Sequence, residues 1–157
     1  MKTRELQTLW WDWLSTSERL LRSLYEQTAA LTLRDVARVE RIQPEIEAHM
    51  MKMREIDASA TACAKKLAAE LGVEPNLRSV ARVLEKAEAE QVQGLANRVI
   101  VAARNVTSVR DKNRKLIENE LTYVNGTLTL IAKAANEGQG KFGKAAVSPS
   151  VLVDQAA

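Results

Sequence analysis

The hydrophobic positions of this chain recur at steps of three and four, which is the spacing of one face of an α-helix. The first stripe of this kind contains Leu6, Trp10, Trp13, Leu20, Leu24 and Leu31, with Ser17 and Gln27 as polar members. Trp11 and Leu14 widen it. The stripe predicts one helix over about residues 3–30.

A second stripe follows after a short restart of the chain. It contains Val36, Val39, Ile42, Ile46, Met50, Met53, Ile56 and Ala60. Thr32, with Asp35 three residues later, resembles a capping box and predicts the start of this helix. Pro44 removes a backbone donor and crowds the preceding turn, so a kink or short break is expected near residue 43. Gly72 and Pro75 predict where the helix ends.

The longest stripe lies in the second half of the chain. Asn76 is a candidate cap for a short helix, and a slip of the apolar phase over residues 88–91 predicts a weak break. The stripe that follows predicts a helix over about residues 90–135, roughly 70 Å long at 1.5 Å per residue. Asn113 interrupts it, either as a buried polar residue that sets the register of helix pairing or as a residue at the solvent-exposed edge.

A helix of that length must pair lengthwise with the first two helices. The predicted fold is therefore all-α: a long antiparallel helical hairpin or slender coiled-coil bundle with a short extra helix. Glycines from Gly138 onward predict the end of the helical pattern, and Ser148-Pro149-Ser150 disfavours another helix. We expect a helical body over residues 1–136 and a flexible C-terminal tail over residues 137–157.

The composition supports this fold and a cytoplasmic location. Six Gly and three Pro leave few turn formers for a many-stranded sheet. The longest apolar run, residues 99–103, is too short to cross a membrane, so no stable membrane insertion is expected. Glu5 and Asp12 argue against a signal peptide. Cys63 is the single cysteine, which excludes an internal disulfide and fits a reducing compartment.

The charges do not indicate a nucleic-acid partner. The net charge is +3, from 23 basic and 20 acidic residues. The densest basic cluster, residues 110–115, has no stacking aromatic side chains nearby and lies on an amphipathic helix. A solvated helix face is the favoured interpretation.

No motif of the chain predicts catalysis, a cofactor or a metal site. His49 is followed by Lys52 one helical turn later, an arrangement similar to histidine phosphotransfer bundles. That family usually has Gly directly after the Lys, whereas this chain has Met53. A histidine at the edge of the apolar stripe is therefore favoured over a phosphorylated one. Cys63 is expected to act as a small apolar residue, and the three Trp residues as packing groups.

The segment DKNRKLIENELTYVNGTL, residues 111–128, resembles the C-terminal helix of the FlgN family of flagellar export chaperones. The order of long, long, short and long helices agrees with that family. The resemblance implies a cytoplasmic protein that keeps hook-filament junction proteins unpaired and delivers them to the type III export gate. It implies binding of this cargo through the C-terminal helical region. On this chain the implied residues are Asn113, Leu116, Ile117, Leu121, Tyr123, Val124, Leu128 and Ile131.

Many members of that family also carry an aromatic-Gly pair in the tail that is linked to the gate protein FlhA. Phe142-Gly143 matches the pair, although Phe replaces Tyr and Ala146 stands at the later Gly position. Gate docking through Phe142 and Gly143 is the resulting hypothesis. Two alternatives stay open: a structural or adaptor coiled coil that self-associates, and a phosphotransfer module that uses His49. The sequence also leaves open whether the free protein is a monomer or a homodimer.

Overall fold

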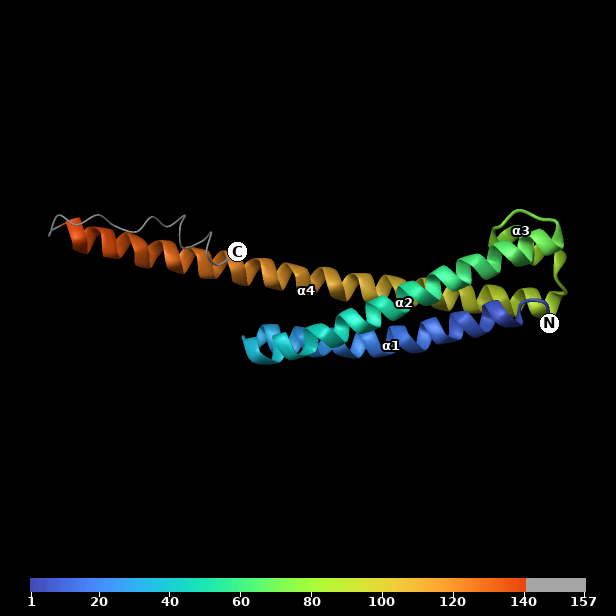
Figure 1. The fold of residues 1–157 in the computed structure, drawn as a ribbon, viewed down its shortest axis with the longest axis horizontal. Helices are drawn as coiled ribbons and strands as arrows, with labels where there is room; N and C mark the ends of the chain where they lie inside the picture. Colours follow the sequence, from blue (N-terminus) through green and yellow to red (C-terminus); the bar gives the residue numbers. More distant parts are fainter. Residues whose placement is uncertain (141–157) are drawn as a thin grey trace. The chain divides into compact units, whose positions relative to one another are not determined.

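The structure, a computed structural model, describes the backbone of residues 1–140 and the side chains of residues 1–137. Within this range it consists of the helices α1 (Arg4–Thr32), α2 (Val36–Leu71), α3 (Leu77–Val83) and α4 (Lys86–Gly140), with no strand (Figure 1). The predicted all-α class is confirmed. The chain divides into two compact units, residues 1–113 and residues 114–157, which are considered separately.

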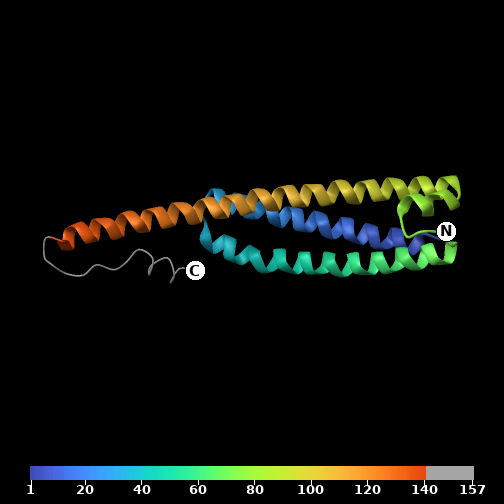
Figure 2. The ribbon, with the colours of Figure 1, turned by 90° about the horizontal axis from the view of Figure 1, so that it is seen from above.

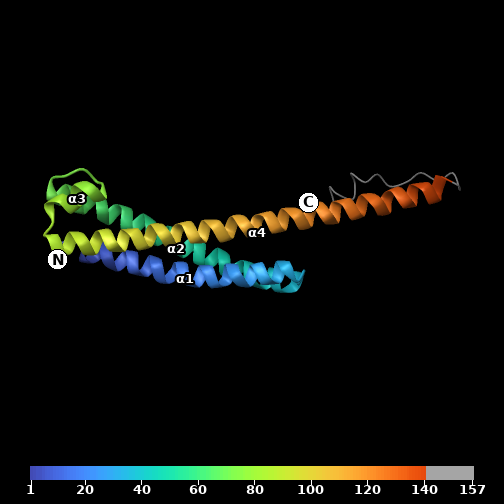
Figure 3. The ribbon, with the colours of Figure 1, turned by 180° about the vertical axis from the view of Figure 1, so that it is seen from behind.

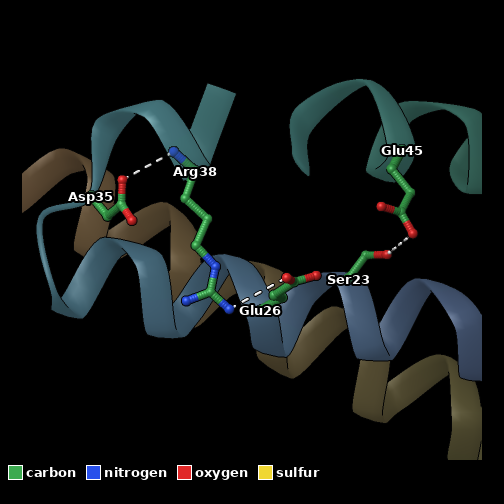
Figure 4. A network of polar contacts seen from close by, with 5 residues as sticks. All are labelled: Ser23, Glu26, Asp35, Arg38 and Glu45. Carbon is green, nitrogen blue, oxygen red and sulfur yellow. Dashed lines mark hydrogen bonds and ion pairs between the residues drawn. The ribbon is translucent and has the colours of Figure 1, made fainter. Parts of the chain in front are cut away.

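The turn between α1 and α2 is closed by backbone hydrogen bonds. Arg34 adopts a left-handed conformation with φ of 54°, and the amide of Asp35 donates to the carbonyl of Ala30 at 2.9 Å. This geometry satisfies the last carbonyls of α1. Asp35 itself caps α2, because its carboxylate accepts from the Arg38 amide at 3.2 Å (Figure 4). The predicted cap at Thr32 was three residues too early, since the Thr32 hydroxyl donates to Thr28 within α1.

Helix α2 runs unbroken through Pro44. Of the kink or short break expected near residue 43, the break is therefore absent. Pro44 is exposed, so the carbonyl of Glu40 that loses its helical donor can turn to water. On either side of the proline, Ile42 and Ile46 are buried in the core and hold the helix in place. The predicted stop is confirmed, because Gly72 ends α2 in the left-handed conformation with φ of 68°.

The break before α4 lies slightly earlier than the sequence pattern predicted. Asn76 caps α3 as expected, with its side-chain oxygen accepting from the Ser79 amide at 2.8 Å. Leu84 is extended and α4 begins at Lys86, so residues 88–91 are already helical. The helix also continues to Gly140, beyond the predicted end near residue 135. A glycine inside a helix costs about 1 kcal/mol but does not forbid it.

In the first unit, α1 lies alongside both α2 and the first part of α4 (Figures 1 and 2). Ser23 bonds Glu45 and Glu26 pairs with Arg38, so α1 and α2 are antiparallel. The hydroxyl of Thr3 donates to Glu88, and that of Thr28 donates to Asn113. Both pairs are 85 residues apart, so α1 and α4 run parallel in one fixed register. The antiparallel hairpin predicted from the sequence is thus confirmed for α1 and α2.

The predicted stripes form the core of this unit in two clusters. One cluster joins α1, α2 and α4 through Leu20, Leu24, Ala30, Ile42, Ile46, Met53 and Val106. The other lies near α3, which sits beside the end of α2 in Figure 3, and contains Leu6, Ala60, Leu67, Ala68 and Val80. Each fully buried leucine contributes about 2 kcal/mol.

Candidate functional site

An exposed apolar face covers α4 between Leu116 and Ile131. Among the predicted site residues, Ile117, Leu121, Tyr123, Val124 and Ile131 are exposed. Leu116 and Leu128 are half-buried. Side chains at positions 117, 121, 124, 128 and 131 follow steps of four and three, so they form one line along the helix. At 1.5 Å per residue the face is about 22 Å long.

Leu130 belongs to the same face, although the sequence analysis did not single it out. It is the most exposed of the large apolar residues in this segment, at 69%. It follows Leu116 and Tyr123 at intervals of seven residues, which places the three in a second line beside the first. This heptad spacing is the signal that could have identified it.

Three threonines of this segment form their hydroxyl hydrogen bonds within α4. The hydroxyls of Thr122, Thr127 and Thr129 each donate to the backbone carbonyl four residues earlier, at 2.9 to 3.0 Å. Their hydrogen-bonding needs are therefore met inside the helix. The two lines of apolar side chains therefore offer mainly hydrocarbon surface to a partner, with Glu120 and Thr127 lying between them. An exposed apolar patch of this kind is typical of a protein-binding site.

Asn113 differs from the other predicted site residues because it is buried, with 2% of its surface exposed. Its amide nitrogen donates to the carbonyl of Leu24 and to the side-chain oxygen of Gln27, both at 2.9 Å. Its oxygen accepts from the Thr28 hydroxyl at 2.6 Å. Of the two roles that the sequence left open, the structure shows the buried one. The amide of Asn113 is fully occupied by α1 and is not displayed to a partner.

His49 lies at the edge of the core. It is half-buried, and its Nε2 is 3.7 Å from the carboxylate of Glu45, which also accepts from Ser23 (Figure 4). Lys52 is exposed, whereas Met53 is buried in the core cluster. The place where phosphotransfer bundles leave room for a docking protein is thus taken up by core packing. His49 therefore lies where the sequence analysis placed it, at the edge of the apolar stripe.

Trp10, Trp13 and Cys63 pack against the core as expected, whereas the expected packing role of Trp11 is wrong. Trp10 and Cys63 pack against the cluster near α3, and Trp13 packs against the larger cluster. Burial raises the pKa of the Cys63 thiol, with the nearby carboxylate of Glu5 acting in the same direction. Trp11 is exposed, and the guanidinium of Arg98 lies 5.4 Å from the centre of its ring.

The described part of the chain lacks two kinds of feature. No helix in this part of the chain combines the length and apolar character needed to span a membrane. Among the same residues, no group of three or more His, Cys, Asp or Glu side chains is arranged to hold a metal ion.

An all-α fold with an exposed apolar helix face is typical of proteins that bind other proteins. The family model of the FlgN protein matches residues 1–146. The match covers most of the chain, which therefore belongs to the FlgN family. It is a non-enzymatic flagellar export chaperone for hook-associated proteins. Comparisons with curated proteins and with solved structures found no match to this chain.

Proposed function

We propose that the apolar face between Leu116 and Ile131 is the surface that binds hook-associated proteins. The observation that carries this proposal is the burial pattern of α4. Val92, Leu95 and Val106 of its stripe are buried, whereas Leu121 and Ile131 further along the helix are exposed. An amphipathic segment of the cargo, laid against this face, would bury apolar surface on both molecules.

The chemistry of this face suits a chaperone that must release its cargo. Binding would rest on apolar contacts, with few fixed hydrogen bonds, because the threonine hydroxyls are satisfied within α4. A cargo segment that becomes ordered on binding loses conformational entropy, which moderates the affinity. Asn113 would not touch the cargo in this scheme. It would position α4 through its hydrogen bonds to α1.

The test uses charge substitutions in the centre of the face. Leu121→Asp and Leu128→Asp would each place a carboxylate in a desolvated contact, which is costly. Binding of a purified hook-associated protein, measured by calorimetry, should weaken by at least about tenfold. The matched control is Thr129→Asp, which adds the same charge at an exposed position that lies on neither line of this face. If the leucine variants remain helical by circular dichroism and bind as tightly as the control, the proposed site is wrong.

The second step of the proposed function is delivery to the export gate in the cytoplasm. Phe142 and Gly143, the residues implied in docking on FlhA, lie outside the described residues. Phe142→Ala should leave cargo binding intact and weaken attachment of the loaded chaperone to the isolated cytoplasmic domain of FlhA. Equal affinities of wild type and variant for that domain would contradict a docking role for Phe142.

A homodimer is a second way to cover the same apolar face. Two copies joined through residues 116–131 would bury the leucines that cargo would otherwise contact. Sedimentation velocity of the free protein tests this directly. A dimer that dissociates in the Leu121→Asp variant would favour self-association through this face, and cargo would then compete with the second copy.

A further inference from the structure

A second apolar surface lies in the first unit, between α1 and the first part of α4. On α1 it is formed by a line of side chains beside the core stripe, at steps of three and four residues. The line contains Trp11, Leu14, Glu18, Leu21 and Tyr25. Trp11 and Tyr25 are 51% and 56% exposed, and Leu14 and Leu21 are half-buried. Exposed Trp and Tyr are the residue types that most often dominate binding energy at protein interfaces.

The surface is a groove rather than a flat strip. An open groove of about 410 Å³ lies between the two helices, with Leu14 and Leu21 on one wall and Val101 and Ala102 on the other. Val101 is 54% exposed although it is β-branched and apolar. A second groove of about 420 Å³, lined in part by Gln7 and Trp11, adjoins the first at Arg98. From Gln7 to Leu21 the two grooves extend for about 21 Å along α1.

The length of this groove and the spacing of its side chains suit an α-helix. Three long helical segments pack in this unit, and two of them, α1 and residues 86–113 of α4, run parallel at a fixed offset. Side chains repeated at three and four residues are the knobs against which a further helix packs. A partner of four to five turns, with apolar residues in the same spacing, would cover Trp11, Leu14, Leu21 and Tyr25 together.

The charge at the centre of the line decides what kind of partner fits. Read in either direction, the line is aromatic, Leu, Glu, Leu, aromatic, with Glu18 in the middle. A second copy of the chain, paired in register through this line in parallel or antiparallel orientation, would bring two Glu18 carboxylates together. Two like charges brought together repel, and the cation that lines this groove, Arg98, already lies over the ring of Trp11. Within the described part of the chain, the Glu18 carboxylate also makes no hydrogen bond or ion pair that would neutralise it.

We propose that this groove is a second docking site for hook-associated proteins. Its occupant is an amphipathic helix of the cargo that carries apolar residues at heptad spacing and a Lys or Arg facing Glu18. The inference rests on the chaperone function but not on the site between Leu116 and Ile131. Arg98, held over the ring of Trp11, supplies a cation on the opposite wall for an acidic residue on the flank of that helix.

The first test is a charge reversal with a matched control. Glu18→Lys changes an exposed residue that the core does not use. It should weaken binding of a purified hook-associated protein about tenfold, because a cation would then face a cation. Glu40→Lys makes the same charge change at an exposed position on α2 and should alter binding less than about twofold. Equal binding by both variants would overturn the proposal.

The second test locates the occupant without depending on affinity. A photo-reactive benzoylphenylalanine placed at Val101, which is exposed, should crosslink to the hook-associated protein in the complex. A crosslink only to a second copy of the chain, or no crosslink at all, would overturn the assignment.

The Leu121→Asp variant, measured in the same binding assay, separates the two sites. If Leu121→Asp loses binding and Glu18→Lys does not, the cargo binds at residues 116–131 and the groove is not a docking site. If Glu18→Lys loses binding and Leu121→Asp does not, the cargo binds in the groove and residues 116–131 are not its site.

Discussion

The two parts of α4, residues 86–113 and residues 114–137, share one helix and one spacing of apolar residues but differ in burial. In the first part Val92, Leu95 and Val106 are buried. In the second part Leu121 is 57% exposed, and Tyr123 and Val124 are exposed as well. An amphipathic pattern therefore shows that a helix has a face to cover, but not whether the same chain covers it.

The two helix contacts of the first unit, α1 with α2 and α1 with α4, differ as well. The contact of α1 with α2 is rich in large apolar side chains, among them Leu20, Leu24 and Ile46. The contact of α1 with α4 is fixed by polar groups near its ends, at Glu88 and Asn113. Apolar packing gives stability without a strict register, whereas a buried hydrogen bond is satisfied in only one register.

The largest effect on stability is expected for a buried residue of the core between α1 and α2. Leu20→Ala removes a side chain that is almost fully buried between α1 and α2 and should lower the free energy of unfolding by about 2–5 kcal/mol. Urea unfolding followed by circular dichroism measures this value. A loss below about 1 kcal/mol would mean that this part of the core is loosely packed.

The next effect concerns the hydrogen bonds that Asn113 of α4 makes to α1. Asn113→Ala leaves the buried side-chain oxygen of Gln27 without its donor and should cost about 1–3 kcal/mol. Asn119→Ala is the matched control, since Asn119 is exposed, and should change stability by less than about 0.5 kcal/mol. Equal stability of the two variants would show that Asn113 does not hold α4 against α1.

A smaller, pH-dependent effect is expected at the hydrogen bond between Thr3 and Glu88. The Thr3 hydroxyl donates to the Glu88 carboxylate at 2.7 Å and lowers the pKa of Glu88 below its usual value of 4.5, against the opposing effect of partial burial. The backbone amide of Thr3, at 2.8 Å, acts in the same direction as the hydroxyl. The ionised carboxylate therefore stabilises the fold above the usual pKa, and this contribution is lost as the pH falls through the lowered pKa.

Glu88→Gln keeps the shape of the side chain and removes the charge. At neutral pH the variant should be less stable by about 1 kcal/mol. Thermal unfolding at several pH values should show the difference from wild type shrinking below pH 4.5, where wild-type Glu88 also becomes protonated. A difference that stays constant down to acid pH would contradict this role for the charge.

The smallest effect is expected on the exposed side of α4. Leu121→Ala makes the same chemical change as Leu20→Ala but should alter the free energy of unfolding by less than about 0.5 kcal/mol, because Leu121 is already in water. The same urea experiment compares the two directly. A large loss of stability at Leu121 would show that this face is covered in the free protein and would sharpen the case for a homodimer.

Much of the fold follows from local features of the sequence. The ends of the helices at Gly72 and Asn76 depend on backbone conformation and on a side chain three residues away, so they could be predicted. The apolar stripes gave the all-α class for the same reason, because helical periodicity is visible within a few turns. The candidate cargo face was predicted from its stripe and from the resemblance to the FlgN family. Leu130 was not named, although it continues the seven-residue spacing of Leu116 and Tyr123.

The sequence by itself determined which segments are helical, where the firmest caps lie and which faces are apolar. Only the tertiary structure decided that α1 and α4 run parallel at an offset of 85 residues, and that Asn113 is buried while Leu121 is exposed. It also set the beginning of α4, where Glu88 binds Thr3. The physical reason is range: periodicity and caps act over a few residues, whereas these pairs join groups that only the packed helices bring together.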